Sequence, residues 1–401
     1  MRTLEWLLLG CLVLNAETVR EVGPDKRYKK PCGAIGAAHS GDTIAIDAGE
    51  YQGDSCIVSQ NKLTIKGVNG RAVVHAPEFL AEGKAMWVVR GNDTTFENIE
   101  SDGAHNPSRN GAPIRLEGRN LTLRNVYFHD NQDGLLTNKD GIGDVLIEYS
   151  EFAHNGFGEG LSHNMYINQA ESFTLRYSYS HDANVGHLVK SRAKVNYILY
   201  NRLIDGPQGQ GSYEIDLPSG GTSYIVGNVI DKGPMSQNSA MICYREEANL
   251  PRQAPFMNPS DDLYVINNTM TSTLVDFVQL ANIDWKQRPA FVVRTPDMNP
   301  EKKPYPMSTR FIQIDPSVKT PALIQNNVFV AKSLKDITGQ PSAKQVTNVV
   351  NDDSRSKKGT PPGKSAGGFD LTPVFQWVEG KVVPRTDATD VGAVQGLGNE
   401  R

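Results

Sequence analysis

The sequence predicts an all-β protein, a parallel β-solenoid in which short strands stack turn upon turn. A run of β-branched and aromatic residues with an Asn or Tyr near its middle recurs about every 25 residues. A further alternating strand follows most of these runs after a turn rich in Gly, Asn and Asp, so no room is left for helices between them. Because one turn cannot bury its apolar face alone, neighbouring turns must stack into a continuous core.

The recurring runs share a central marker residue. These markers are Asn98, Asn125, Tyr149, Tyr177, Asn201, Asn228, Asn268 and Asn327. Asn at the same turn position in successive coils can stack as a hydrogen-bonded amide ladder. The longer intervals after Asn228 and Asn268 predict loops that project from the stack, at 246–262 and 284–310.

The composition is that of a soluble globular protein. The formal net charge is −4 and 38% of the residues are hydrophobic. No broad basic patch appears, so a nucleic-acid partner has no electrostatic support. Gly (37) and Pro (23) are plentiful, which favours many tight turns over long helices. We expect a monomer.

Residues 1–16 are expected to be a cleaved signal peptide, in which an Arg precedes a short apolar run from Trp6 to Leu14. This run is too short for a permanent membrane span, and no other run reaches that length. We therefore expect an exported protein, either periplasmic or secreted. The stretch LLGC also resembles a lipoprotein cleavage box, which leaves open a lipid anchor on Cys11.

The rest of the chain divides into a cap, a coil and a tail. Residues 17–60 are expected to form an N-terminal cap with a short helix in KKPCGAIGAA, followed by the first coil. Residues 61–331 are expected to form the β-helix. A stack of strands leaves open edges that need covers. Residues 332–401 are therefore expected to be an irregular C-terminal segment that packs back on the helix.

The cysteines fit an exported protein, in which disulfides can form. Cys32 and Cys56 both lie in the first coil region and are the preferred pair. Cys243 lies in the apolar stretch SAMICYRE. It is expected to be a buried small hydrophobic residue.

Strand alternation places a polar strip on one outward face. In NMYINQ, GHLVKSRA and SYEIDLP, successive side chains point to opposite faces. With the apolar residues facing in, the residues facing out are Asn164, Tyr166, Lys190, Arg192, Glu214 and Asp216. Stacked strands lie ~4.8 Å apart, so these side chains can form one patch. His163 and His181 border the strip at turns, and His187, at the start of the Lys190 strand, joins the catalytic candidates.

This strip suits abstraction of the weakly acidic C5 proton of a uronate in an acidic polysaccharide. Arg192, a permanent planar cation, can neutralise the uronate carboxylate. The base is either neutral His163 or Lys190, whose pKa the neighbouring Arg192 would lower. Tyr166 or His181 is the acid that protonates the leaving O4 in a lyase. In an epimerase the acid instead returns a proton to C5 from the opposite face.

Several stretches carry a resemblance that covers essentially the whole mature chain. SGDTIAIDAGEY, the repeated Asn-Val-Ile/Phe turns and the closing TDVGA resemble secreted bacterial right-handed parallel β-helix proteins of the pectate-lyase-like superfamily. The resemblance implies a single right-handed parallel β-helix. It is specific for the fold and less so for activity, because one fold hosts many chemistries.

The polar strip resembles motifs of two families that have this fold. LSHN and GHLVKSR resemble the paired motifs of alginate C5-epimerases, which implies His163 as base and Arg192 as the carboxylate-neutralising residue. The Pro and both Asp of that motif are absent. LVKSRAKVNYILYNRL resembles the strand of chondroitinase B-like and alginate lyases that carries the base, which implies Lys190. The acidic calcium ligands and downstream Arg of those lyases have no counterparts here.

Other residues are candidates for holding the sugar chain. The substrate-binding candidates are Asn164, Glu214, Asp216, Tyr244 and Arg245, and the aromatic residues expected to be exposed for sugar stacking are Tyr127, Tyr166, Tyr179 and Tyr244. No zinc-type Cys/His spacing occurs, so no metal site is predicted. No cofactor is required, although calcium stays open as an aid to neutralising the carboxylate.

Two further classes of function stay open. Lys, Arg and Glu are routine on solvated strand faces, so the chain could be a non-catalytic exported β-helix that binds glycan or acts in adhesion. It could also be a glycoside hydrolase that uses carboxylates such as Glu214, Asp216 and Asp182.

Overall fold

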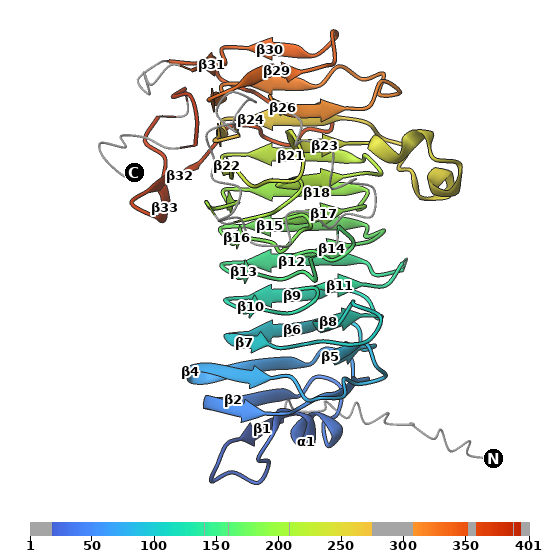
Figure 1. Cartoon of the computed structure of the whole chain (residues 1–401). Helices are drawn as coiled ribbons and strands as arrows, with labels where there is room; N and C mark the ends of the chain where they lie inside the picture. The colour runs from blue at the N-terminus through green and yellow to red at the C-terminus, as the bar shows by residue number, and fades with distance from the viewer. Residues whose placement is uncertain are drawn as a thin grey trace, which may run out of the picture.

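The chain folds as one right-handed parallel β-helix (Figure 1). The computed structural model describes residues 18–139, 141–158, 160–207, 209–274, 308–351, 358–387 and 389–393. The expected signal peptide at 1–16 lies outside the described residues. Within these residues, no helix is long and apolar enough to cross a membrane.

Each turn of the coil contributes a strand to each of three columns, and the first two columns join in one sheet. The base of that sheet is formed by β1 (Val19–Val22), β2 (Thr43–Gln52) and β4 (Thr64–His75). The first column contains β6 (Thr94–Glu97), β9 (Leu121–Arg124), β12 (Asp144–Glu148), β15 (Ser172–Arg176), β18 (Val195–Leu199), β21 (Thr222–Val226), β24 (Leu263–Ile266), β27 (Leu323–Gln325) and β30 (Lys344–Val346). The second column contains β7 (Ile99–Asp102), β10 (Tyr127–His129), β13 (Glu151–Ala153), β16 (Tyr179–His181), β19 (Arg202–Ile204), β22 (Val229–Lys232), β25 (Thr269–Ser272), β28 (Val328–Ala331) and β31 (Val349–Val350).

The third column forms a separate parallel sheet, which carries the polar strip predicted above. It contains β3 (Cys56–Val58), β5 (Ala85–Val89), β8 (Ala112–Leu116), β11 (Leu136–Thr137), β14 (Tyr166–Ile167), β17 (Val189–Ser191), β20 (Ile215–Leu217), β23 (Ala240–Tyr244), β26 (Thr309–Ile314) and β29 (Leu334–Thr338).

Alternating burial drives the stacking. In β10 and β13 the inward residues Phe128 and Phe152 pair in register, with ring centroids 5.7 Å apart, and both are fully buried. Burying each such side chain contributes roughly 1.5–3 kcal/mol. A single core cluster runs from Val22 to Ala331 through all three columns.

The corner between the first and second columns has a two-residue pattern. The first residue has a positive φ, as at Asn125 (51°) and Tyr177 (55°). The second forms the predicted amide ladder: Asn201 Nδ2 donates to Asn228 Oδ1 at 3.0 Å, and Asn228 Nδ2 to Asn268 Oδ1 at 2.9 Å. The predicted marker series therefore mixes two adjacent positions, since its earlier members have positive φ and its later members belong to the ladder.

The N-terminal end is closed by α1 (Pro31–Gly36), the predicted cap helix, whose apolar side packs on the core. The predicted disulfide between Cys32 and Cys56 is present, with the Cα atoms 5.7 Å apart. It ties the cap to β3. Cys243 is a free, buried cysteine, as predicted.

At the other end the coil extends beyond the expected boundary at residue 331. Strands β29 to β31 pair in parallel register with β26 to β28 and add strands from the segment expected to be irregular. The later residues 358–387 and 389–393, here called the C-terminal strap, include the antiparallel pair β32 (Phe375–Val378) and β33 (Lys381–Pro384).

The strap packs back on the outer face of the stack, as expected for the tail. Phe369 lies on Tyr224, with ring centroids 4.4 Å apart, and Leu371 joins the same apolar cluster. The predicted loop at 246–262 contains the short helices η1 (Glu246–Asn249) and η2 (Pro251–Phe256), which project from the stack (Figure 1). The predicted loop at 284–310 lies almost wholly outside the described residues.

Candidate active site

Three strands of the third column bring the predicted strip together. Tyr166 of β14 pairs in register with Lys190 of β17, and Lys190 pairs with Asp216 of β20. The outward orientation follows from alternation, since Ile167 and Val189 lie in the core while Lys190 is only partly covered. The stacking of Tyr166, Lys190 and Asp216 agrees with the prediction from the sequence.

Lys190 is held by a carboxylate. Its Nζ lies 2.8 Å from Asp216 Oδ2, and the Asp216 side chain is 0% exposed. Burial opposes the charge on Lys190, but Asp216 outweighs burial and raises the pKa of the lysine. The lowered pKa expected from Arg192 is therefore wrong, because the partner in the next turn dominates.

Arg192, just beyond β17, is a buried guanidinium with all three nitrogens engaged. Nε donates to the Tyr166 hydroxyl at 2.8 Å, and Nη1 donates to Ser219 at 3.1 Å. Glu247 of η1 accepts from Nη1 at 2.6 Å and from Nη2 at 2.9 Å. Despite burial, Glu247 and Tyr166 raise the pKa of Arg192, so the residue is a permanent cation.

His163 and His187 stack in neighbouring turns, with ring centroids 4.6 Å apart. His163 Nδ1 accepts the His187 backbone N–H at 3.0 Å, and His187 Nδ1 accepts the Tyr213 N–H at 3.2 Å. His187 Nε2 lies 3.3 Å from Asp216 Oδ2. Burial lowers the pKa of both imidazoles well below the usual value, so both are neutral with the proton on Nε2.

A surface pocket of about 190 Å³ opens beside this cluster. Tyr166 and Arg192 line it together with Lys139, and Phe256 of η2 lies opposite, with the Lys139 ammonium 4.2 Å from its ring centroid. The pocket therefore presents an aromatic wall and two cations, which suits an anionic sugar.

Glu214 does not join the outward strip. It lies just before β20, where strand alternation no longer applies, and its Oε1 is 3.1 Å from Lys232 Nζ, with both side chains 0% exposed. Burial raises the pKa of Glu214 to about 8 and that of the neighbouring Asp205 to about 7, although the Lys232 ammonium acts to lower both. Glu214 is an internal residue and cannot contact a sugar chain.

Asn164 is likewise buried rather than substrate-facing. It lies in the corner before β14 and continues a second amide ladder, accepting from Asn155 Nδ2 at 3.1 Å and donating to the His181 carbonyl at 2.8 Å. Both polar atoms of its side chain already have partners in this ladder, so its predicted role in substrate binding is wrong.

Three other predicted residues lie elsewhere. His181 belongs to β16 of the second column, where its imidazole bonds to Asp182 and Glu151 rather than joining Lys190 and Arg192. Tyr244 is 0% exposed, and its hydroxyl donates to the Gly221 carbonyl. Arg245 donates to the Asn258 carbonyl at 2.9 Å and so holds the projecting loop.

Residues that sequence reasoning missed come mainly from this loop. Glu247 reaches Arg192 across 55 residues of chain, and Glu246 accepts from the Tyr213 hydroxyl and the Cys243 thiol, both at 3.1 Å. Nothing in the strand pattern places a loop carboxylate on a particular strand. The only signal is that EE at 246–247 directly follows a strand of the same column.

A calcium ion fits this cluster poorly. Asp216, Cys243 and Glu246 offer ligand atoms within 4.8 Å of one another. Calcium takes six to eight oxygen ligands, whereas one donor here is a thiol whose pKa burial raises, and Asp216 already binds the Lys190 ammonium.

Comparisons with known proteins bear on the fold. No family model and no curated protein sequence matches the chain. The crystal structure of pectate lyase Pel9A superposes with a TM-score of 0.54 at 12% identity, covering 95% of this chain and 94% of that one. The PL6-family alginate lyase AlyGC gives a TM-score of 0.36 at 12% identity, covering 95% of this chain and 57% of that one. At this identity, the likeness to Pel9A shows a shared right-handed parallel β-helix fold alone.

Proposed function

We propose that this protein acts on an acidic polysaccharide by abstracting the C5 proton of a uronate residue, as a lyase or a C5-epimerase. One observation carries the proposal. Tyr166 and Arg192 line an open pocket, and Lys190 lies next to them, with the Lys190 Nζ 5.5 Å and the Arg192 Cζ 5.8 Å from the centre of the Tyr166 ring. The name of the solved structure that shares this fold, a pectate lyase, supports an acidic polysaccharide as the substrate class.

Arg192 is the residue that would bind the substrate carboxylate. Its two terminal nitrogens already hold the Glu247 carboxylate in the two-pronged geometry that Arg uses for carboxylates. A uronate that replaces Glu247 would receive the same bonds. Neutralising the carboxylate lets the electron pair left by the C5 proton spread onto it, which makes that proton more acidic.

Lys190 is the better of the two predicted bases. The Nδ1 lone pair of His163 is taken by the His187 backbone N–H, and its other nitrogen carries the proton. Lys190 accepts the C5 proton as its neutral amine, and the Asp216 carboxylate 2.8 Å away opposes loss of the ammonium proton, so this base becomes available only as pH rises.

Tyr166 is the predicted acid that remains on this face. Its oxygen accepts from Arg192 Nε, so its own proton is available for donation. In elimination, the C4–O4 bond breaks and Tyr166 donates to the leaving O4. In epimerisation, a proton returns to C5 from the opposite face instead.

The carboxylates that the glycoside hydrolase alternative would use do not lie together on the surface. Glu214 is bound to Lys232 in the interior, Asp216 is 0% exposed beside Lys190, and Asp182 lies on the second column. These carboxylates therefore do not flank a common groove, as acid and nucleophile must.

A glycan-binding role is favoured by a different surface. A pocket of about 250 Å³ on the second column is lined by Tyr149, Tyr177 and Trp377, with Arg71 and Arg202 beside them. Aromatic faces and cations of this kind bind anionic sugar chains without chemistry.

The deciding experiment is proton NMR of the protein with alginate, pectate, glucuronan and chondroitin in heavy water. An olefinic H4 signal identifies a lyase, and deuterium at C5 without chain cleavage identifies an epimerase. If every substrate stays unchanged while one of them binds, the protein is a glycan-binding module and the catalytic proposal fails.

A further inference from the structure

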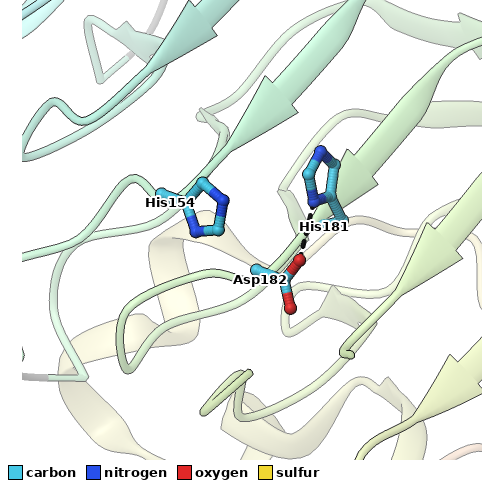
Figure 2. A group of neighbouring side chains, drawn as sticks. All are labelled: His154, His181 and Asp182. Carbon is cyan, nitrogen blue, oxygen red and sulfur yellow. Dashed lines mark hydrogen bonds and ion pairs between the residues drawn. The ribbon is translucent and has the colours of Figure 1, made fainter. Parts of the chain in front are cut away.

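A second cluster of reactive side chains lies on the second column, away from Lys190 and Arg192. His154 follows β13, and His181 and Asp182 lie at the end of β16 in the next turn. Figure 2 shows the two imidazoles and the carboxylate arranged around a common space. One nitrogen or oxygen from each of these residues lies within 4.8 Å of the others.

The coil itself places these ligands side by side. The strand register sets His154 opposite Asp182, one residue beyond the pair Ala153 and His181. His154 and Asp182 both have positive φ, at 53° and 47°. The same tight corner therefore projects an imidazole from one turn and a carboxylate from the next, with the strands ~4.8 Å apart.

The neighbours of the cluster hold it in an orientation suited to binding a metal. Without a metal ion, both nitrogens of His181 donate to carboxylates, Nε2 to Glu151 Oε1 at 3.1 Å and Nδ1 to Asp182 Oδ2 at 2.7 Å. A metal ion would displace the Nδ1 proton, and Glu151 would keep the proton on Nε2. A carboxylate on the second nitrogen is the usual partner of a metal-binding histidine. Asp182 Oδ1 is fixed by the Gly206 N–H at 3.0 Å, which leaves Oδ2 turned toward the histidines.

We propose that His154, His181 and Asp182 bind a divalent transition-metal ion of the zinc class, with Glu151 orienting His181. Two imidazoles and one carboxylate are ligands that zinc accepts and calcium does not favour. His154 is exposed, so the remaining coordination positions face solvent. The ion links neighbouring turns of the coil, and this site is independent of the proposed enzymatic activity.

The chain contains a matched control. His129 Nδ1 lies 2.6 Å from Asp130 Oδ2 and its Nε2 lies 3.4 Å from Glu100, while Tyr127 stacks on it as Tyr179 does on His181. The register places Gly103 opposite Asp130 in the preceding turn, where the metal cluster has His154. This histidine–aspartate pair therefore lacks a third ligand from the preceding turn. The register also sets His154 opposite Asp130 from the following turn, but among the described residues the His154 ligand atom groups with His181 and Asp182.

The test is zinc and cobalt(II) titration of the full chain without a histidine tag, by calorimetry and visible absorption. The wild type is expected to bind one equivalent and to gain thermal stability in zinc. His154→Ala, a change at an exposed residue, should weaken binding at least about 10-fold, and Glu151→Gln about 10–100-fold. His129→Ala should bind as the wild type does. Failure of the wild type to bind one equivalent overturns the proposal, as does equal binding by wild type and His154→Ala or equal loss in His129→Ala.

Discussion

Arg192 holds the carboxylate of Glu247 with both terminal nitrogens, at 2.6 and 2.9 Å. Glu247 lies in η1, at the start of the projecting loop, and Arg192 just beyond β17 in the third column. The loop therefore places an internal carboxylate where the proposed substrate would place its own. The substrate carboxylate and the Glu247 carboxylate would therefore compete for Arg192.

Glu247→Gln should improve substrate binding. The amide keeps the shape of the side chain but removes the charge that competes for Arg192, so the KM for the uronate polymer should fall roughly three- to ten-fold. Initial rates across substrate concentration measure this. Glu171→Gln, which affects only an exposed pair with Lys194, is the control. An unchanged or higher KM in Glu247→Gln would show that Glu247 supports the site rather than competing with substrate.

Lys190→Ala and Arg192→Ala should each remove turnover. Loss of a general base costs about 10²–10⁴-fold in rate, and loss of the carboxylate-binding cation should cost a similar factor. Lys194→Ala is matched in residue type and lies close by, but its ammonium is exposed and bound to Glu171. It should retain wild-type activity. Turnover by Lys190→Ala at the wild-type rate would remove Lys190 from the mechanism.

The pH dependence of kcat/KM distinguishes the two predicted bases. Asp216 raises the pKa of Lys190, so its neutral amine becomes more abundant as pH increases. A lysine base should therefore give a rate that rises about ten-fold per pH unit through the neutral and alkaline range. Burial lowers the pKa of His163 well below its usual value, so a His163 base would give a flat profile over the same range.

The amide ladder should contribute measurably to stability. In Asn228→Ala, the hydrogen bonds from Asn201 and to Asn268 are lost inside a buried corner. We expect the free energy of unfolding to fall by about 1–3 kcal/mol, as measured by denaturant titration. Asn184 is exposed, and its Ala variant should change stability by less than about 0.5 kcal/mol. Equal effects of the two substitutions would contradict a stabilising ladder.

The buried carboxyls should make stability depend on pH. The pKa is raised to about 8 in Glu214 and to about 7 in Asp205, so the folded state keeps protons that the unfolded chain releases. Their contribution is therefore complete at acidic pH and is lost as pH rises through these values. Because the same carboxyls titrate at about pH 4 in the unfolded chain, we expect thermal stability to fall from about pH 4 to about pH 8 and to level off above that. Glu214→Gln leaves one carboxyl for Lys232 and should flatten this dependence, and an equally steep dependence in the variant would contradict the assignment.

The repeat and the strand alternation were enough to predict the coil and the face that carries Tyr166, Lys190 and Arg192. Alternation failed for Asn164 and Glu214 because both lie in corners just outside their strands, where the chain turns inward. His181 was misplaced because strands of two different columns are only a few residues apart in the sequence. The contact from Glu247 depends on how a loop folds over the sheet, and no local pattern encodes that contact.

The C-terminal strap affects how the molecule unfolds. Stacked repeats ordinarily fray from their ends, since each one touches only its neighbours. Here the strap crosses back over the stack, and Val374 N–H donates to the Tyr200 hydroxyl at 3.1 Å while Gly392 N–H donates to the Asn326 carbonyl at 2.8 Å. The coil that ends at Asn326 is therefore tied through the strap to the coil at Tyr200, three turns earlier. We expect this linkage to make the coils between them unfold together rather than one at a time.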